Sequence, residues 1–104
     1  MAESNFQSKV KTWLKQKGCF VIVMSAGPGV PDGTPDVCAL FNGGGWAMLE
    51  VKAKSPYKKD GTPLKGAFKP LQIPTIKKLN DMYYSAVVYP ENWDKIKKEL
   101  EQII

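Results

Sequence analysis

Three residues in the middle of the chain, Asp36, Glu50 and Lys52, have the side-chain types of a site that binds a divalent cation and activates a water molecule. Glu50 and Lys52 are two positions apart, so on a β-strand their side chains share one face and lie about 7 Å apart. Asp36 precedes another strand-like run, and a neighbouring strand can bring it beside them. Two carboxylates that converge at strand ends, with a lysine alongside, are typical of such a site.

Each of these residues also has a simpler explanation. Glu50 and Lys52 could form a surface ion pair on a half-exposed strand, since Glu-x-Lys is a common tripeptide. A second Pro-Asp pair, Pro31-Asp32, lies four residues before Pro35-Asp36. We prefer Asp36 because an apolar run follows it directly, whereas Asp32 is followed by Gly-Thr-Pro, which is typical of a turn.

Apolar spacing predicts the elements that position these residues. Helices are expected around Phe6–Leu14, ending at Lys17-Gly18, then from near Pro74 to about Met82, and over 92–102. Four short apolar runs predict strands, at 20–24, which should be fully buried, and at 37–41, 46–52 and 85–89. The order αβββαβα indicates one α/β domain over residues 1–104, with a mixed sheet flanked by helices and an extra C-terminal helix.

The hairpin between the second and third strands decides where Asp36 points. Asn42–Gly45 is predicted to be a four-residue connection. A simple hairpin of that length would pair Asp36 with Val51, which places Asp36 on the face opposite Glu50. The site therefore requires a bulge in the glycine run or a bend at Asp36, and glycine tolerates the positive φ that such a bulge needs.

Together these motifs resemble the PD-(D/E)xK nuclease superfamily. The matching residues are Gly33-Thr34-Pro35-Asp36 and Leu49-Glu50-Val51-Lys52, with a predicted hairpin between them. Within the superfamily the chain is similar to the virus-type replication-repair nucleases (VRR-NUC) and to Holliday-junction-resolvase-like enzymes. The family core is a restriction-endonuclease-like αβββαβ fold, so the resemblance covers most of the chain.

Three flanking residues extend the resemblance. Glu3 and Gln7 on the first helix are similar to the family's Glu-x-x-x-Gln, whose glutamate reaches towards the metal. Gln72 is similar to the glutamine that follows the Glu-x-Lys strand. Two of these residues have simpler explanations, because Ser4-Asn-Phe-Gln7 matches a helix capping box and Gln72 could be a loop amide near the start of the second helix.

The resemblance implies a metal site and a set of catalytic residues. It implies that Mg²⁺ or Mn²⁺ is held by four groups, namely Asp36, Glu50, Glu3 and the main-chain carbonyl of Val51. It implies that four side chains take part in catalysis, namely Asp36, Glu50, Lys52 and Gln72. The expected activity is metal-dependent endonucleolytic hydrolysis of DNA, directed by branched or junction structure rather than by sequence, in a setting such as phage DNA repair.

The charge of the chain indicates the same partner. The net charge is +5, and all fifteen basic residues are lysines. Lysine suits contacts to phosphate, which position a nucleic acid without reading its sequence. The long segment 53–70 holds the lysines expected to bind DNA: Lys54, Lys58, Lys59, Lys65 and Lys69. Tyr57 and Phe68 in this segment could stack on unpaired bases or pin the loop to the core, and a solvated loop is the alternative explanation of its lysines.

Composition excludes several classes of function. With no histidine and only two cysteines, Cys19 and Cys38, the chain lacks a zinc cluster and the usual hydrolase triads, and both thiols should be buried and reduced. No apolar run approaches the eighteen or so residues of a membrane span. The N-terminal residues lack the apolar core of a signal peptide, so we expect a cytoplasmic protein.

Two alternatives to this function stay open, together with the assembly state. A DNA-binding or assembly module could keep this fold without cleavage, although all three core residues are present. A monomeric nickase or exonuclease is the second alternative. Cutting both strands of a junction favours a homodimer. An apolar stripe at the C-terminus supports one, unless core packing accounts for it: Trp93, Ile96, Leu100, Ile103 and Ile104.

Overall fold

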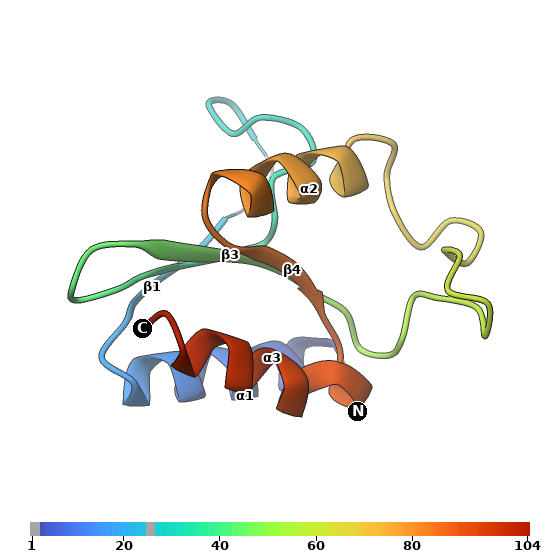
Figure 1. Ribbon diagram of the computed structural model, residues 1–104. Coiled ribbons are helices and arrows are strands. Elements are labelled where there is room, and N and C mark those ends of the chain that lie inside the picture. Colours follow the sequence, from blue (N-terminus) through green and yellow to red (C-terminus); the bar gives the residue numbers. More distant parts are fainter. Residues whose placement is uncertain (1–2, 25–26) are drawn as a thin grey trace.

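The protein is a four-stranded mixed sheet with helices on both faces (Figure 1). It is described from a computed structural model that covers residues 3–24 and 27–104, without the side chains of residues 3 and 4. Its elements are α1 (Glu3–Gln16), β1 (Phe20–Val23), β2 (Val37–Leu40), β3 (Trp46–Val51), α2 (Gln72–Met82), β4 (Ser85–Val88), η1 (Pro90–Asn92) and α3 (Trp93–Glu101). The predicted α/β class and the order αβββαβα are confirmed, with the 3₁₀-helix η1 added before α3.

The four strands lie in the order β1-β2-β3-β4. β1, β2 and β3 pair antiparallel, whereas β4 pairs parallel with β3. A parallel pair needs a crossover connection, and α2 supplies it. In Figure 1, α2 covers one face of the sheet while α1 and α3 cover the other.

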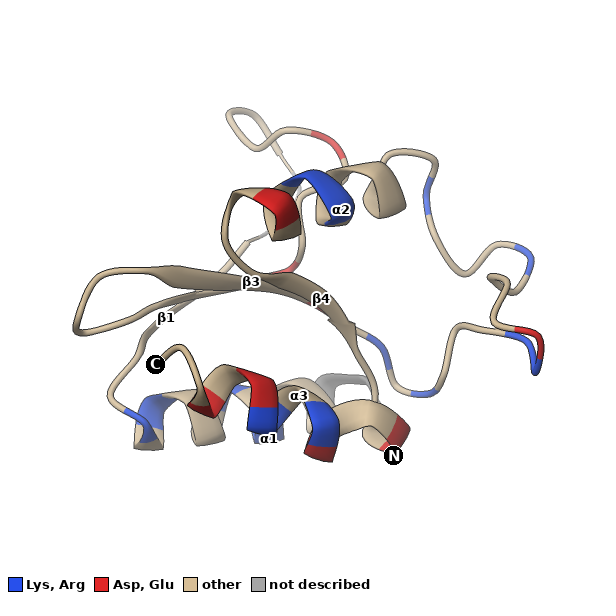
Figure 2. Cartoon of the chain, viewed as in Figure 1, with Lys and Arg blue, Asp and Glu red and all other residues tan. Residues whose placement is uncertain are grey.

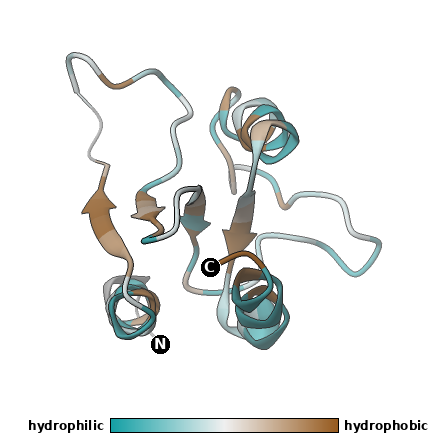
Figure 3. Cartoon of the chain, turned by 60° about the vertical axis from the view of Figure 1, so that its left-hand side comes forward, coloured by the Kyte–Doolittle hydropathy of each residue, from teal (hydrophilic) through white to brown (hydrophobic). Residues whose placement is uncertain are grey.

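The main core lies between the sheet and the layer formed by α1 and α3. Ala47, Leu49 and Val51 alternate along β3 and are buried in this core. The strand positions between them, Met48 and Glu50, therefore face the side of the sheet that α2 covers. In Figure 3 the hydrophobic colour concentrates on the strands and the hydrophilic colour on the outer surfaces of the helices. This arrangement puts the proposed metal-binding position of β3, Glu50, on the α2 side.

β1 is an edge strand, and the expectation that it is fully buried was wrong. Phe20 is 66% exposed, and Ile22 and Val23 are exposed as well. α2 packs on β3 and β4, so it leaves the outer face of β1 uncovered. An all-apolar run is typical of a central strand, but it does not by itself distinguish a central strand from an edge strand.

The apolar stripe at the C-terminus belongs mostly to the core. Trp93, Ile96 and Leu100 are buried, and Ile103 packs against the core from a partly buried position. Ile104 is exposed. Core packing thus explains most of the stripe, so the stripe gives no separate support for a homodimer, which stays a prediction.

Two further expectations concern the thiols and the membrane. Cys19 is buried and Cys38 is half-buried, and both are free thiols. Burial raises the pKa of both thiols, which favours their protonated form near neutral pH. None of the helices in the described part of the chain has the length and apolar content to span a bilayer.

Candidate active site

The pairing of β2 with β3 places Asp36 beside Glu50. Val37 pairs with Leu49, so one step beyond this pair Asp36 comes opposite Glu50. A simple four-residue hairpin would have set Asp36 opposite Val51 and turned it to the other face. The sheet therefore has the one-residue shift that the predicted site requires.

The glycine run produces this shift because Gly45 takes part in the strand pairing. The N–H of Phe41 donates to the carbonyl of Gly45 at 3.0 Å, and the N–H of Gly44 donates to the carbonyl of Phe41 at 3.2 Å. The predicted four-residue loop was therefore wrong, since the loop proper is 42–44. Gly44 has a φ of +87° and Gly45 a φ of +105°, values that glycine adopts without steric cost. A three-residue loop that ends in a left-handed glycine is a common hairpin connection.

Asp36 is held by groups from two elements. Its Oδ1 accepts a hydrogen bond from the N–H of Val51, and its Oδ2 accepts one from Nε2 of Gln7, both at 2.8 Å. The carboxylate thus lies at the end of the sheet, in contact with α1 on one side and β3 on the other. The capping-box explanation of Gln7 was wrong, because α1 already includes Ser4 and the Gln7 amide reaches Asp36.

The main-chain carbonyl of Val51 faces the same place. The N–H and C=O of one strand residue project to the same side of the strand. Since the N–H of Val51 donates to Asp36, its carbonyl also projects from the side of β3 that faces β2. The carboxylate and the carbonyl that the resemblance assigns to one metal therefore share this side of β3.

Glu50 is a nearly buried carboxylate, with 6% of the residue exposed. Its Oε2 accepts a hydrogen bond from Nε2 of Gln72 at 3.2 Å and lies 3.6 Å from Nζ of Lys52. Gln72 is itself fixed, because its Oε1 accepts from the N–H of Lys69 at 2.8 Å. A buried charge is costly unless it is paired, and these contacts offset that cost.

Gln72 lies on α2 and not in the preceding loop. The helix begins at Gln72, two residues before the predicted start at Pro74. Proline is tolerated within the first turn because its missing N–H would have no partner inside the helix. The explanation of Gln72 as a loop amide was therefore wrong, and the first turn of α2 holds its amide against Glu50.

Lys52 lies between Glu50 and an aromatic cluster formed by Tyr57, Phe68 and Tyr89. Its Nζ lies 5.2 Å from the centre of the Phe68 ring, a cation–π contact. The ring centres of Tyr57 and Phe68 are 5.9 Å apart, and those of Tyr57 and Tyr89 are 6.1 Å apart. Burial and, less strongly, Tyr89 raise the pKa of Tyr57, which stays a neutral phenol. Tyr57 and Phe68 thus pin the loop to the body of the protein.

Asp36 and Glu50 line one cavity of about 600 Å³. The loop before β2 and the first turn of α2 form its other walls. The lining residues are Met24, Val30, Pro31, Asp32, Gly33, Thr34, Asp36, Glu50, Lys69, Pro70, Leu71 and Gln72. The loop touches the helix at Gly33, where a Cβ would lie 2.5 Å from the carbonyl oxygen of Leu71. Only glycine fits this contact, which closes one side of the cavity.

The third acidic residue that lines the cavity, Asp32, does not join this pair of carboxylates. Asp32 is an exposed turn residue, as expected, although it also lines the cavity. Within residues 5–24 and 27–104, no three Asp, Glu, Cys or His side chains form a group that could hold a metal ion, so Asp32 does not join Asp36 and Glu50. Glu3 is the first residue of α1, and its side chain lies outside the described residues.

The predicted DNA-binding lysines occupy three places along the loop between β3 and α2 (Figure 2). Lys69 lines the cavity, and Lys54 and Lys65 line a second hollow together with Lys52. The remaining two, Lys58 and Lys59, are exposed at the tip of the loop.

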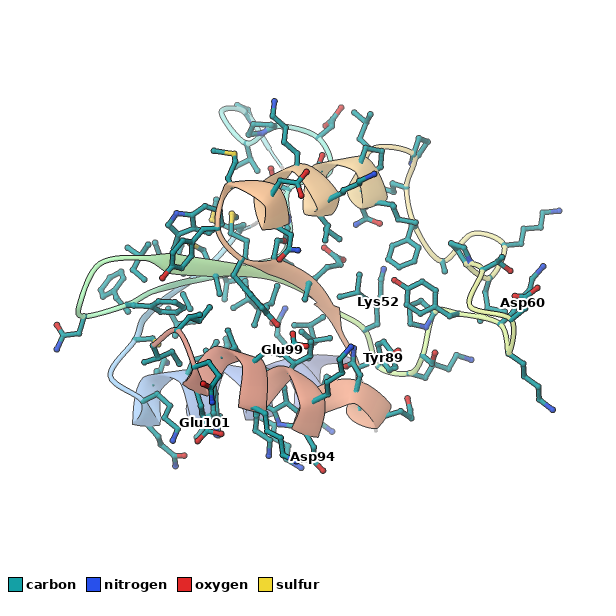
Figure 4. The ribbon with its side chains drawn as sticks, viewed as in Figure 1. Lys52, Asp60, Tyr89, Asp94, Glu99 and Glu101 are labelled. Atoms are coloured by element: carbon teal, nitrogen blue, oxygen red, sulfur yellow. The ribbon has the colours of Figure 1, made fainter. Side chains whose placement is uncertain are left out.

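The tip of this loop is a small hairpin that points away from the site. The N–H of Lys58 donates to the carbonyl of Thr62 at 2.7 Å. Asp60 Oδ1 accepts from the hydroxyl of Thr62 at 2.7 Å and from its N–H at 3.0 Å, which lowers the pKa of Asp60. In Figure 4, Asp60 lies at the far end of the loop, whereas Lys52 and Tyr89 lie at its base. The tip lysines are therefore remote from the two carboxylates.

Sequence reasoning missed two parts of this environment. Tyr89 was assigned only to a strand, yet it anchors the loop through Tyr57. The sequence held a signal for this, because the ends of two parallel neighbouring strands meet at one edge of a sheet, which brings the residues after β3 and β4 together. The structure shows this neighbourhood, since the N–H of Lys52 donates to the carbonyl of Val88 at 2.8 Å. Met24 was placed in a strand, but it lines the cavity, and its N–H donates to the carbonyl of Asp36 at 2.8 Å.

No protein-family model, curated protein or solved structure matches this chain. The interpretation of the site therefore rests on its geometry and on the sequence resemblance described above.

Proposed function

We propose that this protein is a divalent-metal-dependent nuclease that hydrolyses phosphodiester bonds of DNA, with Asp36, Glu50 and Lys52 at the centre of its active site. One observation carries the proposal. Two carboxylates from neighbouring strands line one cavity, and the Lys52 ammonium lies 3.6 Å from Oε2 of Glu50. Residues 14 positions apart in the sequence converge only because the hairpin has its particular register.

The donor set fits a hard cation. Mg²⁺ and Mn²⁺ prefer oxygen ligands, and Mg²⁺ is commonly held by one or two carboxylates together with water and substrate phosphate. Asp36, Glu50 and the carbonyl of Val51 supply such oxygens, and Glu3 is the proposed fourth group. When bound, the ion would lower the pKa of a water and neutralise charge on the scissile phosphate.

The residues of the chain have separate tasks in this proposal. Lys52 is the positive charge that faces the reacting phosphate, where it stabilises the negative charge that develops during attack. Phe68 and Glu50 hold its ammonium from two sides, so the charge is positioned before substrate arrives. Gln72 orients the Glu50 carboxylate, and Gln7 orients that of Asp36.

The substrate is proposed to be DNA recognised by its backbone. Lys69, which lines the cavity, and Lys54 and Lys65, which line the second hollow, can neutralise phosphates on either side of the cut. Lysine carries no fork for reading base edges. Such contacts favour a structure-specific endonuclease acting on branched DNA. A homodimer would place two sites against a two-fold junction, and sedimentation of the free protein and of its junction complex tests this.

A substrate panel tests the proposed function directly. The purified protein is incubated with Mg²⁺ and four-way junction, flap, nicked, duplex and single-stranded DNA, and products are mapped at nucleotide resolution. We expect internal cuts, with junction or flap DNA preferred over duplex. Cutting only from DNA ends would favour the exonuclease. Cutting of one strand by a monomeric protein would favour the nickase. Binding without any cleavage would favour the non-cleaving module.

A further inference from the structure

A second hollow lies beside the carboxylate cavity and has the opposite chemistry. It has a volume of about 370 Å³ and is formed by the two segments 52–56 and 64–67. Of the described residues that line it, three are lysines and none is acidic: Lys52, Ala53, Lys54, Ser55, Pro56, Leu64, Lys65, Gly66 and Ala67. Three lysines along one concave surface give it a positive potential.

The walls of this hollow are fixed by the backbone. The N–H of Leu64 donates to the carbonyl of Pro56 at 2.8 Å, which joins the two segments. The N–H of Ala67 donates to the carbonyl of Leu64 at 3.1 Å, which closes a turn. Pro56 is buried, and the N–H of Ser55 donates to Oε1 of Glu91 at 3.1 Å. The hollow is thus a formed surface, unlike a set of lysines on an extended chain.

Lys52 connects the hollow with the carboxylate cavity. Its ammonium lies 3.6 Å from Oε2 of Glu50, which lines the cavity, and Lys52 also lines the hollow. A nucleic-acid strand whose scissile phosphate lies at Lys52 therefore has its next lysines, Lys54 and Lys65, in the hollow. The tip lysines, Lys58 and Lys59, do not line it.

We propose that the hollow between segments 52–56 and 64–67 binds a backbone phosphate of the nucleic acid, next to the phosphate that is cut. The position of this site next to the scissile phosphate rests on the proposed nuclease function. The phosphate site itself rests on the hollow and its lysines. The same chemistry accepts an internal phosphodiester or a terminal 5′-phosphate. The first source places the site along a continuous strand, and the second places it at a DNA end.

Two double variants of the full chain test the proposal, since each removes two charges from the same loop. Lys54→Gln with Lys65→Gln removes the charge of two lysines that line the hollow. Lys58→Gln with Lys59→Gln is the matched control at the tip. Fluorescence anisotropy measures the Kd of a labelled single-stranded oligonucleotide in EDTA, over a series of salt concentrations. We expect the hollow variant to raise the Kd about tenfold, and to lower the slope of log K against log salt by about 0.7 for each phosphate that is no longer neutralised. The tip variant should change the Kd by less than about threefold.

Equal weakening by the two double variants would overturn the proposal, because the lysines would then act only through net charge. A 5′-phosphorylated and a 5′-hydroxyl probe distinguish the two sources. A preference of the parental protein for the phosphorylated probe that the hollow variant loses supports a terminal phosphate. Equal binding of both probes, weakened in the hollow variant alone, supports an internal one. Because EDTA prevents metal-dependent cleavage, a protein that cuts no DNA can still show this contrast, so failure of the nuclease function is distinguishable from failure of the phosphate site.

Discussion

The main-chain N–H of Val51 donates to Oδ1 of Asp36 across 2.8 Å, so the residue between Glu50 and Lys52 is tied to the carboxylate of the neighbouring strand. This bond gives Asp36 a structural task in addition to its proposed role as a metal ligand. Substitutions at the site must therefore be tested for both stability and activity, and the two effects are separable.

Lys52→Ala should abolish cleavage, with a loss of at least about hundredfold, because it removes the positive charge that faces the phosphate. The free energy of unfolding should also fall by about 1–3 kcal/mol, since buried Glu50 loses one partner. Cleavage rates and urea denaturation measure the two effects. Lys77→Ala, at an exposed position of α2, is the control and should cut like the parental protein. Parental cleavage by Lys52→Ala would remove Lys52 from the mechanism.

Asp36→Asn should also abolish cleavage while the protein stays folded. An amide oxygen still accepts from Val51, so the free energy of unfolding should fall by only about 1–2 kcal/mol. Gln7→Ala is the comparison, because it removes the other hydrogen bond to Asp36 and leaves both carboxylates in place. We expect Gln7→Ala to keep measurable cleavage at a similar loss of stability. If the two variants are equally inactive, the charge of Asp36 is not what matters.

Asp32→Asn should leave the cleavage rate within about twofold of the parental rate, as surface changes usually have small effects. Asp32 is exposed and lies in a turn, although it lines the cavity. The same kinetic assay measures it. Inactivity of Asp32→Asn beside an active Asp36→Asn would mean that the wrong Pro-Asp pair was chosen.

Cleavage should require Mg²⁺ or Mn²⁺, and Ca²⁺ should support it poorly. Ca²⁺ takes six to eight oxygen ligands with loose geometry, whereas the chemistry needs a tightly positioned water. Rates are measured in EDTA-treated protein after each cation is added back. Full activity in excess EDTA would contradict the proposed role of the metal. DNA binding without metal would still agree with the proposed lysine contacts to phosphate.

Gly45→Ala should destabilise the hairpin and weaken cleavage, because it disturbs the register that sets Asp36 opposite Glu50. A Cβ at Gly45 would lie 2.7 Å from the hydroxyl oxygen of Tyr83, and the residue has a φ of +105°. A loss of about 1–3 kcal/mol is expected for such a strained position. Gly43→Ala is the matched control, with open space around its Cβ and no positive φ. Equal stability of the two variants would contradict this account of the loop.

The sequence predicted the element order and the shared cavity of Asp36 and Glu50 because local patterns carry that information. The period of Phe6, Val10 and Leu14 identified α1, and the glycine run identified the hairpin together with the need for a shift. The shift itself was left open between a bulge and a bend. The pairing of Phe41 with Gly45 depends on how the two strands twist and meet, which no local pattern fixes.

The contacts between distant segments could not be predicted in the same way. The exposure of β1 depends on where α2 lies, and the cation–π contact of Lys52 with Phe68 depends on the path of an irregular loop. The start of α2 at Gln72 was misjudged because Pro74 is compatible with several positions in a first turn. Tertiary packing decided each of these features.

The loop between β3 and α2 begins at Lys52, and Gln72 follows it as the first residue of α2. Both of these residues contact the same carboxylate oxygen of Glu50. The two residues that bound the loop are thus fastened to one point. In consequence, the tip of the loop, residues 58–62, is an exchangeable cassette, whereas Phe68 and Lys69 nearer its end help to hold Lys52 and Gln72. The length, charge and turns of the tip can be replaced without moving the groups proposed to cut DNA.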